Sequence, residues 1–230
     1  MTWTVAAAAR PILQLVTDRR RHATLTGPAS LDRIVETARR AAEGGIDLIQ
    51  IREAGLADRD LLALVTRVLS AVRHTAARVL VNGRTDVALA AAAHGVHLPA
   101  SAPVASRVRR IVAADFVIGR SVHSRAEAQA AEADGGCDYL TFGTVFATTS
   151  KPADHTIAGM PTLQEVCTAV RLPILAIGGL SRERMPEVAK AGAAGVAAIG
   201  LFADASAGDA QEMRTIVDGL RMAYATGVRG

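Results

Sequence analysis

Aromatic side chains are rare in this sequence of 230 residues, which contains one Trp, two Tyr and four Phe. Proteins that hold single-stranded nucleic acid stack its bases on aromatic rings, and here no basic cluster carries aromatics between its charges. We therefore expect no nucleic-acid partner. Cysteine is rarer still: Cys137 and Cys167 stand far apart and match neither a disulfide framework nor a zinc site. We expect free thiols in a cytoplasmic protein.

Long apolar runs and lysines are also missing. The stretch Val5 to Ala9 is too short to cross a bilayer and follows no basic region, so we expect neither a membrane segment nor a secretory signal. We interpret residues 1–11 as an N-terminal extension. Lysine occurs only at positions 151 and 190, so arginine supplies most of the positive charge behind a net charge of +4. Arginine suits small anionic substrates as well as it suits nucleic acid.

Hydrophobic residues make up 50% of the chain, and most of them are Ala, Val, Leu and Ile. From residue 12 onward, short apolar runs alternate with longer amphipathic stretches, a pattern typical of helices around a parallel sheet. We predict eight strands, over Ile12 to Thr17, Ile46 to Arg52, Arg78 to Asn82, Gly95 to Leu98, Phe116 to His123, Tyr139 to Phe146, Ile174 to Gly178 and Val196 to Leu201. No linker divides the chain, and no G-x-G-x-x-G follows the first strand. The pattern favours an α/β fold with a single (β/α)8 TIM barrel over residues 12–226 above a doubly wound sheet.

Hydroxyl side chains mark the expected helix starts, because the first amides of a helix need acceptors that the helix does not supply. Ser or Thr followed three residues later by Glu is typical of a capping box at the first turn. The predicted caps are Ser30, Ser124 with Glu127, Thr162 with Glu165, and Ser181.

Glycines follow the last two predicted strands, at the end of the barrel where functional residues belong. Strand seven ends in Ile177-Gly178-Gly179, and strand eight ends in Ile199-Gly200-Leu201. Glycine lets backbone N–H groups approach a ligand closely, so these turns favour a phosphate site. The alternative is that glycine only permits a tight turn.

Polar side chains end strands two and three. Gln50 and Arg52 lie two residues apart, so both point into the barrel mouth, and Asn82 closes the next strand. An arginine in this position needs an anionic partner. That partner is either a substrate or an internal carboxylate such as Asp18.

Two histidines occupy the predicted strands and carry different expectations. His97 lies inside an apolar strand, where a hydrogen-bonded core histidine is the favoured interpretation. His123 follows Ser121 and precedes the capping Ser124, so its ring should lie at the mouth beside a helix N-terminus. The positive end of a helix dipole favours neutral imidazole, which a general base needs near pH 7. A surface histidine at a helix start is the alternative.

The loop after strand six contains Thr148, Ser150 and Lys151 and suggests a second anion contact or a lid, with a solvated turn as the alternative. Carboxylates, in contrast, do not gather at the strand ends. Asp18, Asp86 and Asp138 are isolated in the sequence, so we expect no metal ion.

Six motifs in order give the chain a resemblance to a known superfamily. They are Gly45-x-x-x-x-Gln50-Ile51-Arg52, Val81-Asn82-Gly83-Arg84-x-Asp86-Val87, Gly95-Val96-His97-Leu98, Gly119-x-Ser121-Val122-His123-Ser124, the segment from Asp138 to Lys151, and Ile177-Gly178-Gly179. Over residues 12–204 the chain resembles the thiamine phosphate synthase superfamily, and within it the TenI-like branch of thiazole tautomerases. The resemblance implies a barrel that binds a phosphorylated thiazole.

Three departures decide between the branches. Where the synthases carry a lysine and two metal-binding aspartates, this chain has Ala54, Gly83 and Ala102. Loss of the metal site should remove the charge compensation that a pyrimidine diphosphate needs as a leaving group. The resemblance then implies a cofactor-independent thiazole tautomerase, an isomerase in which His123 moves the proton and Arg52 pairs with the substrate carboxylate.

Two alternatives stay open beside the tautomerase. One is a divergent thiamine phosphate synthase, a transferase; the other is a regulatory barrel that binds thiazole or thiamine phosphates without chemistry. In each case Gln50, Arg52, Asn82, Ser121, Thr148, Ser150, Lys151, Gly178, Gly179, Ile199 and Gly200 are the candidate ligand contacts. Barrels of this size often form homodimers or higher homo-oligomers, and the hydrophobic content allows an apolar interface.

Overall fold

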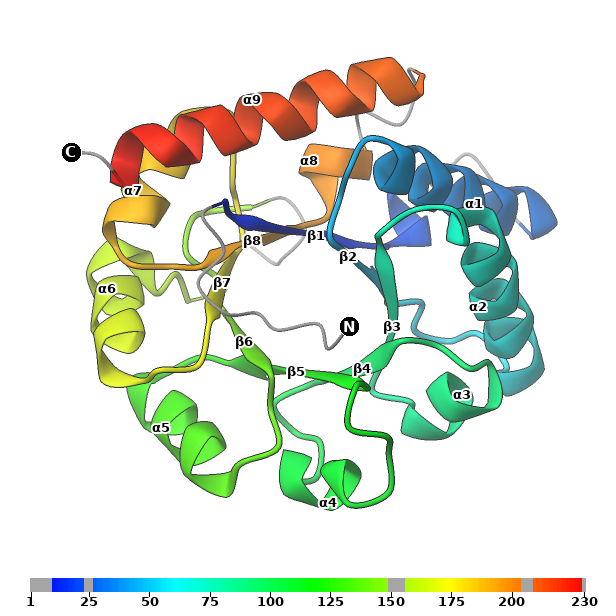
Figure 1. Cartoon of the computed structure of the whole chain (residues 1–230), viewed down its shortest axis with the longest axis horizontal. Helices are drawn as coiled ribbons and strands as arrows, with labels where there is room; N and C mark the ends of the chain where they lie inside the picture. Colours follow the sequence, from blue (N-terminus) through cyan, green and yellow to red (C-terminus); the bar gives the residue numbers. More distant parts are fainter. Residues whose placement is uncertain (1–9, 23–26, 149–155, 204–208, 229–230) are drawn as a thin grey trace.

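Eight parallel strands form a closed barrel in sequence order, with β8 paired back to β1 (Figure 1). The computed structural model describes residues 10–22, 27–148, 156–203 and 209–228. The strands are β1 (Ile12–Val16), β2 (Leu48–Ile51), β3 (Arg78–Asn82), β4 (Gly95–Leu98), β5 (Val117–Val122), β6 (Tyr139–Phe142), β7 (Ile174–Ile177) and β8 (Gly195–Ala198). All eight predicted strands are present, several of them shorter than expected at their ends, and the predicted (β/α)8 barrel is confirmed.

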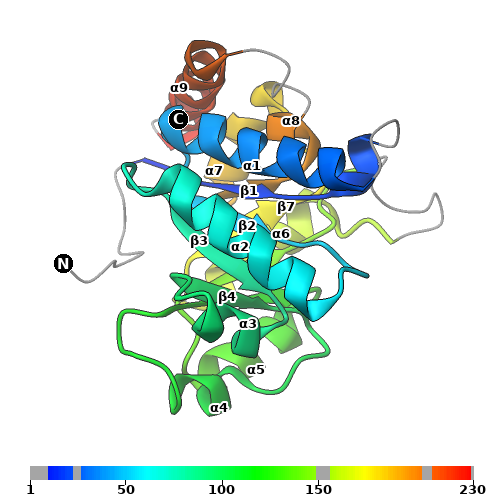
Figure 2. The ribbon, with the colours of Figure 1, turned by 90° about the vertical axis from the view of Figure 1, so that its right-hand side faces the viewer.

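Helices cover the outside of the barrel. They are α1 (Pro28–Glu43), α2 (Asp58–Val72), α3 (Thr85–Ala90), α4 (Ala105–Arg109), α5 (Arg125–Asp134), α6 (Gly159–Ala169), α7 (Met185–Lys190), α8 (Gly200–Ala203) and α9 (Ala210–Val228), with 3-10 turns η1 (Arg19–His22) and η2 (Arg182–Arg184). Figure 2 shows α1 and α2 side by side over the strands at the start of the chain. The segment after β8 contains both α8 and α9 within the described ranges, where a single helix was predicted.

Side chains inside the barrel change from apolar to polar along the strands. Because strand residues alternate between the two faces, positions two apart share the interior. At the N-terminal ends, a separate cluster of buried side chains fills the interior, made of Ile12, Leu48, Leu80, Val117, Tyr139 and Leu175. Two residues further along β1 and β2 stand Gln14 and Gln50, both buried. The barrel interior is therefore apolar near the N-terminal ends of the strands and polar near their C-terminal ends, where it opens to solvent.

Only one of the predicted capping boxes has the expected hydrogen bond. Ser124 accepts a bond from the Glu127 N–H at the start of α5, as predicted. Thr162 lies inside α6, and its hydroxyl donates to the Ala158 carbonyl, so the prediction of a cap there is wrong. Ser30 is no cap either, because α1 already begins at Pro28, whose fixed φ suits a first turn.

The remaining predicted cap, Ser181, precedes the 3-10 turn η2 and not an α-helix, because α7 begins at Met185. The predicted helix start was thus one short turn early. As for membrane insertion, the described ranges contain no helix that is both long and apolar enough to span a bilayer. The predicted extension over residues 1–11 falls almost entirely outside the described residues.

Candidate active site

A cavity of about 700 Å³ lies at the C-terminal ends of the barrel strands. It brings together ten residues that the sequence analysis singled out, namely Gln50, Arg52, Asn82, Ser121, His123, Thr148, Gly178, Gly179, Ile199 and Gly200. Ser150 and Lys151 lie outside the described residues. The cavity also includes Arg21 and Thr141, which the sequence analysis did not select.

Arg52 projects from the end of β2 and is anchored through its backbone. Its N–H donates to the Thr17 hydroxyl at 3.0 Å, which ties the strand end to its neighbour β1. The expected internal partner, Asp18, instead pairs with Arg20, with 2.9 Å between Oδ1 and Nε. Among the described residues, no carboxylate forms an ion pair with the Arg52 guanidinium. Asp18 thus forms its ion pair with Arg20 and not with Arg52, although the charge of Arg52, after the hydrogen bonds from Arg20, also helps to lower the Asp18 pKa.

The next residue, Glu53, is buried behind the cavity and not in it. Burial raises the pKa of its carboxyl group, and hydrogen bonds from the Thr17 hydroxyl and the Arg19 N–H act in the opposite direction. Glu53 thus helps to hold the ends of β1 and β2 together. It does not place a carboxylate against a ligand.

His97 is a hydrogen-bonded core histidine, as predicted, although its ring also forms part of the cavity floor. Its Nδ1 lies 3.1 Å from the Tyr139 hydroxyl, and its Nε2 lies 2.9 Å from the Ser121 hydroxyl. Burial lowers its pKa to about 3, and the nearby charge of Arg52 adds to the effect. The ring is therefore neutral throughout the physiological pH range.

His123 lies at the rim, with 53% of its side chain exposed. Its N–H donates to Glu127 Oε2 at 2.7 Å, and its ring Nδ1 lies 3.4 Å from the same oxygen. The position before the cap Ser124 is the expected one. Because half of the side chain is exposed to solvent, the His123 ring is not enclosed in the cavity.

The turn after β7 needs glycine for two structural reasons. Gly178 and Gly179 have φ angles of 104° and 61°, which other residues rarely adopt. A Cβ at Gly178 would lie 2.5 Å from the Thr144 methyl, and one at Gly179 would overlap the Ala147 carbonyl. The turn therefore packs directly on the segment that follows β6, and both lie on the cavity wall.

Arg184 contacts both the turn after β7 and the segment that follows β6. Its guanidinium donates to the Gly179 carbonyl and lies over the Phe146 ring, 4.2 Å from the centroid. With the carbonyl oxygen taken by Arg184, the peptide is fixed in one orientation. Glycine here is thus explained by the turn itself, and phosphate binding by its N–H groups is an additional hypothesis.

The residues that line the cavity do not fit a divalent metal ion. None of the described lining residues carries a carboxylate, and no three His, Cys, Asp or Glu side chains in the described part of the chain gather as a metal site. Gly83, which follows β3, has a φ of 70°, so its backbone is left-handed.

The two cysteines form no disulfide, as the sequence predicted. The Cys137 and Cys167 thiols are free, and burial raises the pKa of each.

Comparison with known proteins gives one consistent answer. A family model described as thiamine monophosphate synthase matches residues 13–202. A thiamine-phosphate synthase from Methanoculleus marisnigri is 43% identical over 164 residues, 71% of this chain and 77% of that protein. Another, from Roseiflexus sp., is 38% identical over 188 residues, 82% of this chain and 76% of that protein.

One solved structure agrees with the sequences. Thiamine phosphate pyrophosphorylase from Pyrococcus furiosus superposes with a TM-score of 0.73 at 33% identity, over 90% of this chain and 96% of that one. The likeness therefore includes the whole barrel and is close enough in sequence to concern more than the fold.

These relatives contradict the predicted thiazole tautomerase. Two are named thiamine-phosphate synthase and the third thiamine phosphate pyrophosphorylase, and the isomerase assignment finds no support among them. That prediction rested on His123 and on three departures, at Ala54, Gly83 and Ala102, which were given more weight than the likeness along the rest of the barrel. The alternative synthase interpretation is the better supported one.

Proposed function

This chain belongs to the thiamine monophosphate synthase family, and from that premise we propose that it is a thiamine-phosphate synthase. The reaction is a group transfer that joins a phosphorylated thiazole to a pyrimidine diphosphate. The observation that carries the proposal is the high identity to a protein of that name over most of both chains.

The chemistry asks the protein mainly for positioning and charge compensation. A carbon–nitrogen bond forms between the thiazole nitrogen and the methylene carbon of the pyrimidine. The bond from that carbon to the diphosphate oxygen breaks, and diphosphate leaves with the electron pair. No proton leaves the methylene carbon in this step. Holding the two ligands in line and stabilising the departing anion are therefore the main contributions of the site.

Two anion-binding regions are available on opposite sides of the mouth. We assign the thiazole phosphate to the turns after β7 and β8, where Gly178, Gly179, Ile199 and Gly200 line the cavity. Backbone N–H groups at such turns suit a phosphate. This assignment is supported by the three glycines on the cavity wall, Gly178, Gly179 and Gly200, because no side chain of theirs covers the backbone there.

The diphosphate belongs on the opposite wall, beside Arg52. Arg52 and Asn82 end neighbouring strands, and Arg21 lies on the same cavity. Guanidinium groups suit phosphate oxygens because their planar donors can bind two at once. Because the described residues do not fit a metal ion, we assign the charge compensation to these arginines and derive no step through a metal.

The remaining predicted residues have smaller parts in the proposal. Gln50, Ser121 and Thr148 supply polar groups around the pyrimidine, and Lys151 is proposed as a further anion contact from the loop after β6. The acid–base part predicted for His123 belonged to the isomerisation. It is not carried over, since this transfer removes no proton from carbon.

The test is synthesis itself. The full chain is incubated with the pyrimidine diphosphate and the thiazole phosphate, and thiamine phosphate is measured by its fluorescence after oxidation. We expect product that depends on both substrates, with reactions lacking either one as controls. Binding of both substrates without any product would contradict the synthase proposal and leave the regulatory interpretation.

A further inference from the structure

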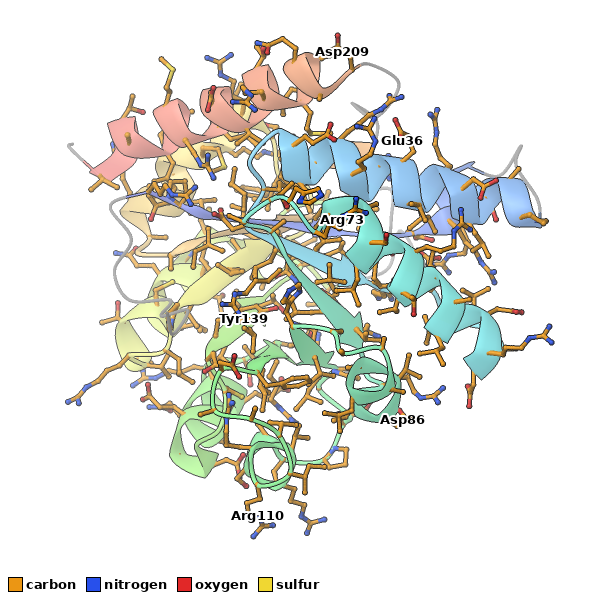
Figure 3. The ribbon with its side chains drawn as sticks, turned by 45° about the vertical axis from the view of Figure 1, so that its right-hand side comes forward. Glu36, Arg73, Asp86, Arg110, Tyr139 and Asp209 are labelled. Atoms are coloured by element: carbon orange, nitrogen blue, oxygen red, sulfur yellow. The ribbon has the colours of Figure 1, made fainter. Side chains whose placement is uncertain are left out.

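Six polar side chains from six neighbouring strands form a continuous hydrogen-bonded chain inside the barrel. We call it the polar belt; in order along the bonds it consists of Asn82, Gln50, Gln14, Tyr139, His97 and Ser121. Figure 3 shows Tyr139 within the ring of strands. Only Gln14 and Tyr139 are absent from the cavity lining among these described residues.

We propose that Gln14 is a positioning residue that fixes the direction of every hydrogen bond in the polar belt. In that direction both ends of the belt, Asn82 and Ser121, turn hydrogen-bond donors toward the cavity. Donors are what phosphate and other anionic ligands require. The inference rests on the proposed function, because it explains how a phosphorylated substrate is recognised.

The first arm of the belt runs from Gln14 to Asn82. Gln14 Nε2 donates to Gln50 Oε1 at 2.9 Å, and Gln50 Nε2 donates to Asn82 Oδ1 at 2.9 Å. An amide group has one acceptor oxygen and one donor nitrogen. With its oxygen occupied by Gln50, Asn82 offers its N–H groups to the mouth.

The second arm runs from Gln14 to Ser121. A hydrogen bond from Gln14 to the phenol oxygen opposes the rise that burial imposes on the Tyr139 pKa. The Tyr139 O–H is then available to donate to His97 Nδ1. Neutral His97 has one N–H, so that hydrogen lies on Nε2 and is donated to the Ser121 hydroxyl. The Thr141 hydroxyl, 3.3 Å from both His97 Nε2 and the Ser121 oxygen, donates to Ser121. With His97 and Thr141 both donating to it, Ser121 turns its own hydrogen toward the cavity.

The same side chains could also form these hydrogen bonds in the reverse direction, so at least one residue must determine which direction is adopted. In reverse, the Gln14 carbonyl would accept from both neighbours, and both of its N–H groups would be buried without partners. In the observed direction, Gln14 Oε1 is the one fully buried belt atom left without a hydrogen bond in the described structure. Buried N–H groups without partners are rarer and more costly than an unused carbonyl oxygen. Gln14, which is 0% exposed, therefore sets the direction.

Packing keeps Tyr139 in the path between the arms. A Cβ at Gly119 would overlap the Tyr139 ring, so glycine at this place in β5 makes room for the phenol to reach across the interior. The Tyr139 ring is tilted against His97, with centroids 5.8 Å apart. The second arm is thus held by shape as well as by hydrogen bonds.

The first experiment needs no variant. Long-range proton–nitrogen NMR correlations on the full chain report which ring nitrogen of His97 carries the hydrogen. We expect the Nε2–H tautomer, and finding Nδ1–H would overturn the inference. The measurement does not depend on catalysis, so a chain with Nε2–H that makes no thiamine phosphate would count against the proposed function alone.

The second experiment reverses the belt. At about pH 9 a glutamate at position 14 that accepts two hydrogen bonds is ionised and acts only as an acceptor. Gln14→Glu should switch His97 to Nδ1–H and weaken binding of inorganic diphosphate by about tenfold, the cost of roughly one hydrogen bond. Gln14→Met is the matched control, of similar size but without polarity.

The two variants separate direction from packing. We expect Gln14→Met to weaken diphosphate binding by only about threefold, because Asn82 keeps the freedom to turn its N–H groups outward. Equal losses in the two variants, or an unchanged His97 tautomer in Gln14→Glu, would overturn the inference. Synthase activity measured alongside a wild-type Nδ1–H tautomer would remove the inference and leave the proposed function standing.

Discussion

Arg52 illustrates how single residues at the mouth are prepared for a ligand by their neighbours. The Thr17 hydroxyl accepts from the Arg52 backbone and is also bonded to the buried Glu53 carboxyl. Asp18, which follows the end of β1, forms an ion pair with Arg20. Both nearby acids thus bond to other groups, and within the described ranges no carboxylate forms an ion pair with the Arg52 guanidinium, which lines the cavity.

Replacing Arg52 should therefore affect the transfer step strongly. For Arg52→Gln we expect kcat/KM for thiamine phosphate formation to fall by about 10²- to 10³-fold, the usual cost of removing one group that stabilises a developing anion. Arg59→Gln is the matched control, because that side chain is 93% exposed on α2. Similar rates in Arg52→Gln and the wild type would remove Arg52 from the site.

Most of the candidate residues predicted from the sequence do line the cavity, but the sequence analysis missed Arg21 and Thr141 on the cavity, and Gln14 and Tyr139 in the polar belt. Strand ends are visible in a sequence, so Gln50, Arg52 and Asn82 could be placed at the mouth in advance. Tyr139 and Gln14 could not, because their part depends on the barrel closing and bringing β1 beside the rest of the belt. The polar Gln14 within an apolar strand was the one available signal.

At the level of elements, the strands were predictable and the helix starts were not. A run of buried Val, Ile and Leu identifies a strand on its own, whereas Ser or Thr with Glu three residues later also occurs inside helices. Thr162 is such a case, since its hydroxyl bonds back to the Ala158 carbonyl within the helix. Ser124 differs because it has the extended φ of −144° and ψ of 162° typical of a cap.

These two hydroxyl residues should respond differently to the same change. Ser124→Ala removes the acceptor for the Glu127 N–H and should lower the free energy of unfolding by about 1 kcal/mol. Thr162→Ala removes only a hydroxyl that donates to a carbonyl, so no helix amide loses its acceptor, and the cost should be less than about 0.5 kcal/mol. Urea denaturation of both variants measures the difference, and equal losses would contradict the role of Ser124 as the cap.

For the molecule as a whole, the neutral core histidine links stability to pH. Folded His97 has a pKa of about 3, compared with 6.5 in an unfolded chain. Between pH 3 and pH 6.5, His97 is protonated in the unfolded chain and neutral in the folded barrel. Stability that is present above pH 6.5 is therefore lost as the pH falls toward 3, by at most about 1.4 kcal/mol per pH unit.

His97→Gln should make this dependence shallower. Burial lowers the pKa of His94 as well, and the raised pKa of Glu53 acts in the opposite sense, but both groups are present in the two proteins. The difference in slope between wild type and variant then belongs to His97. Urea denaturation at pH 7, 6, 5 and 4 measures it, and parallel curves would show that His97 accepts a proton in the folded state.

Charge at the barrel mouth also governs how a ligand arrives from solution. Arg21 and Arg52 line a concave wall, no carboxylate stands among the described lining residues, and the chain carries a net charge of +4. A wall of one sign focuses its field outward and draws in opposite charges from about one Debye length, roughly 10 Å at 0.1 M salt. The arginines to which we assign the departing diphosphate should thus also attract the pyrimidine diphosphate from solution, and the range of this attraction shortens as ionic strength rises.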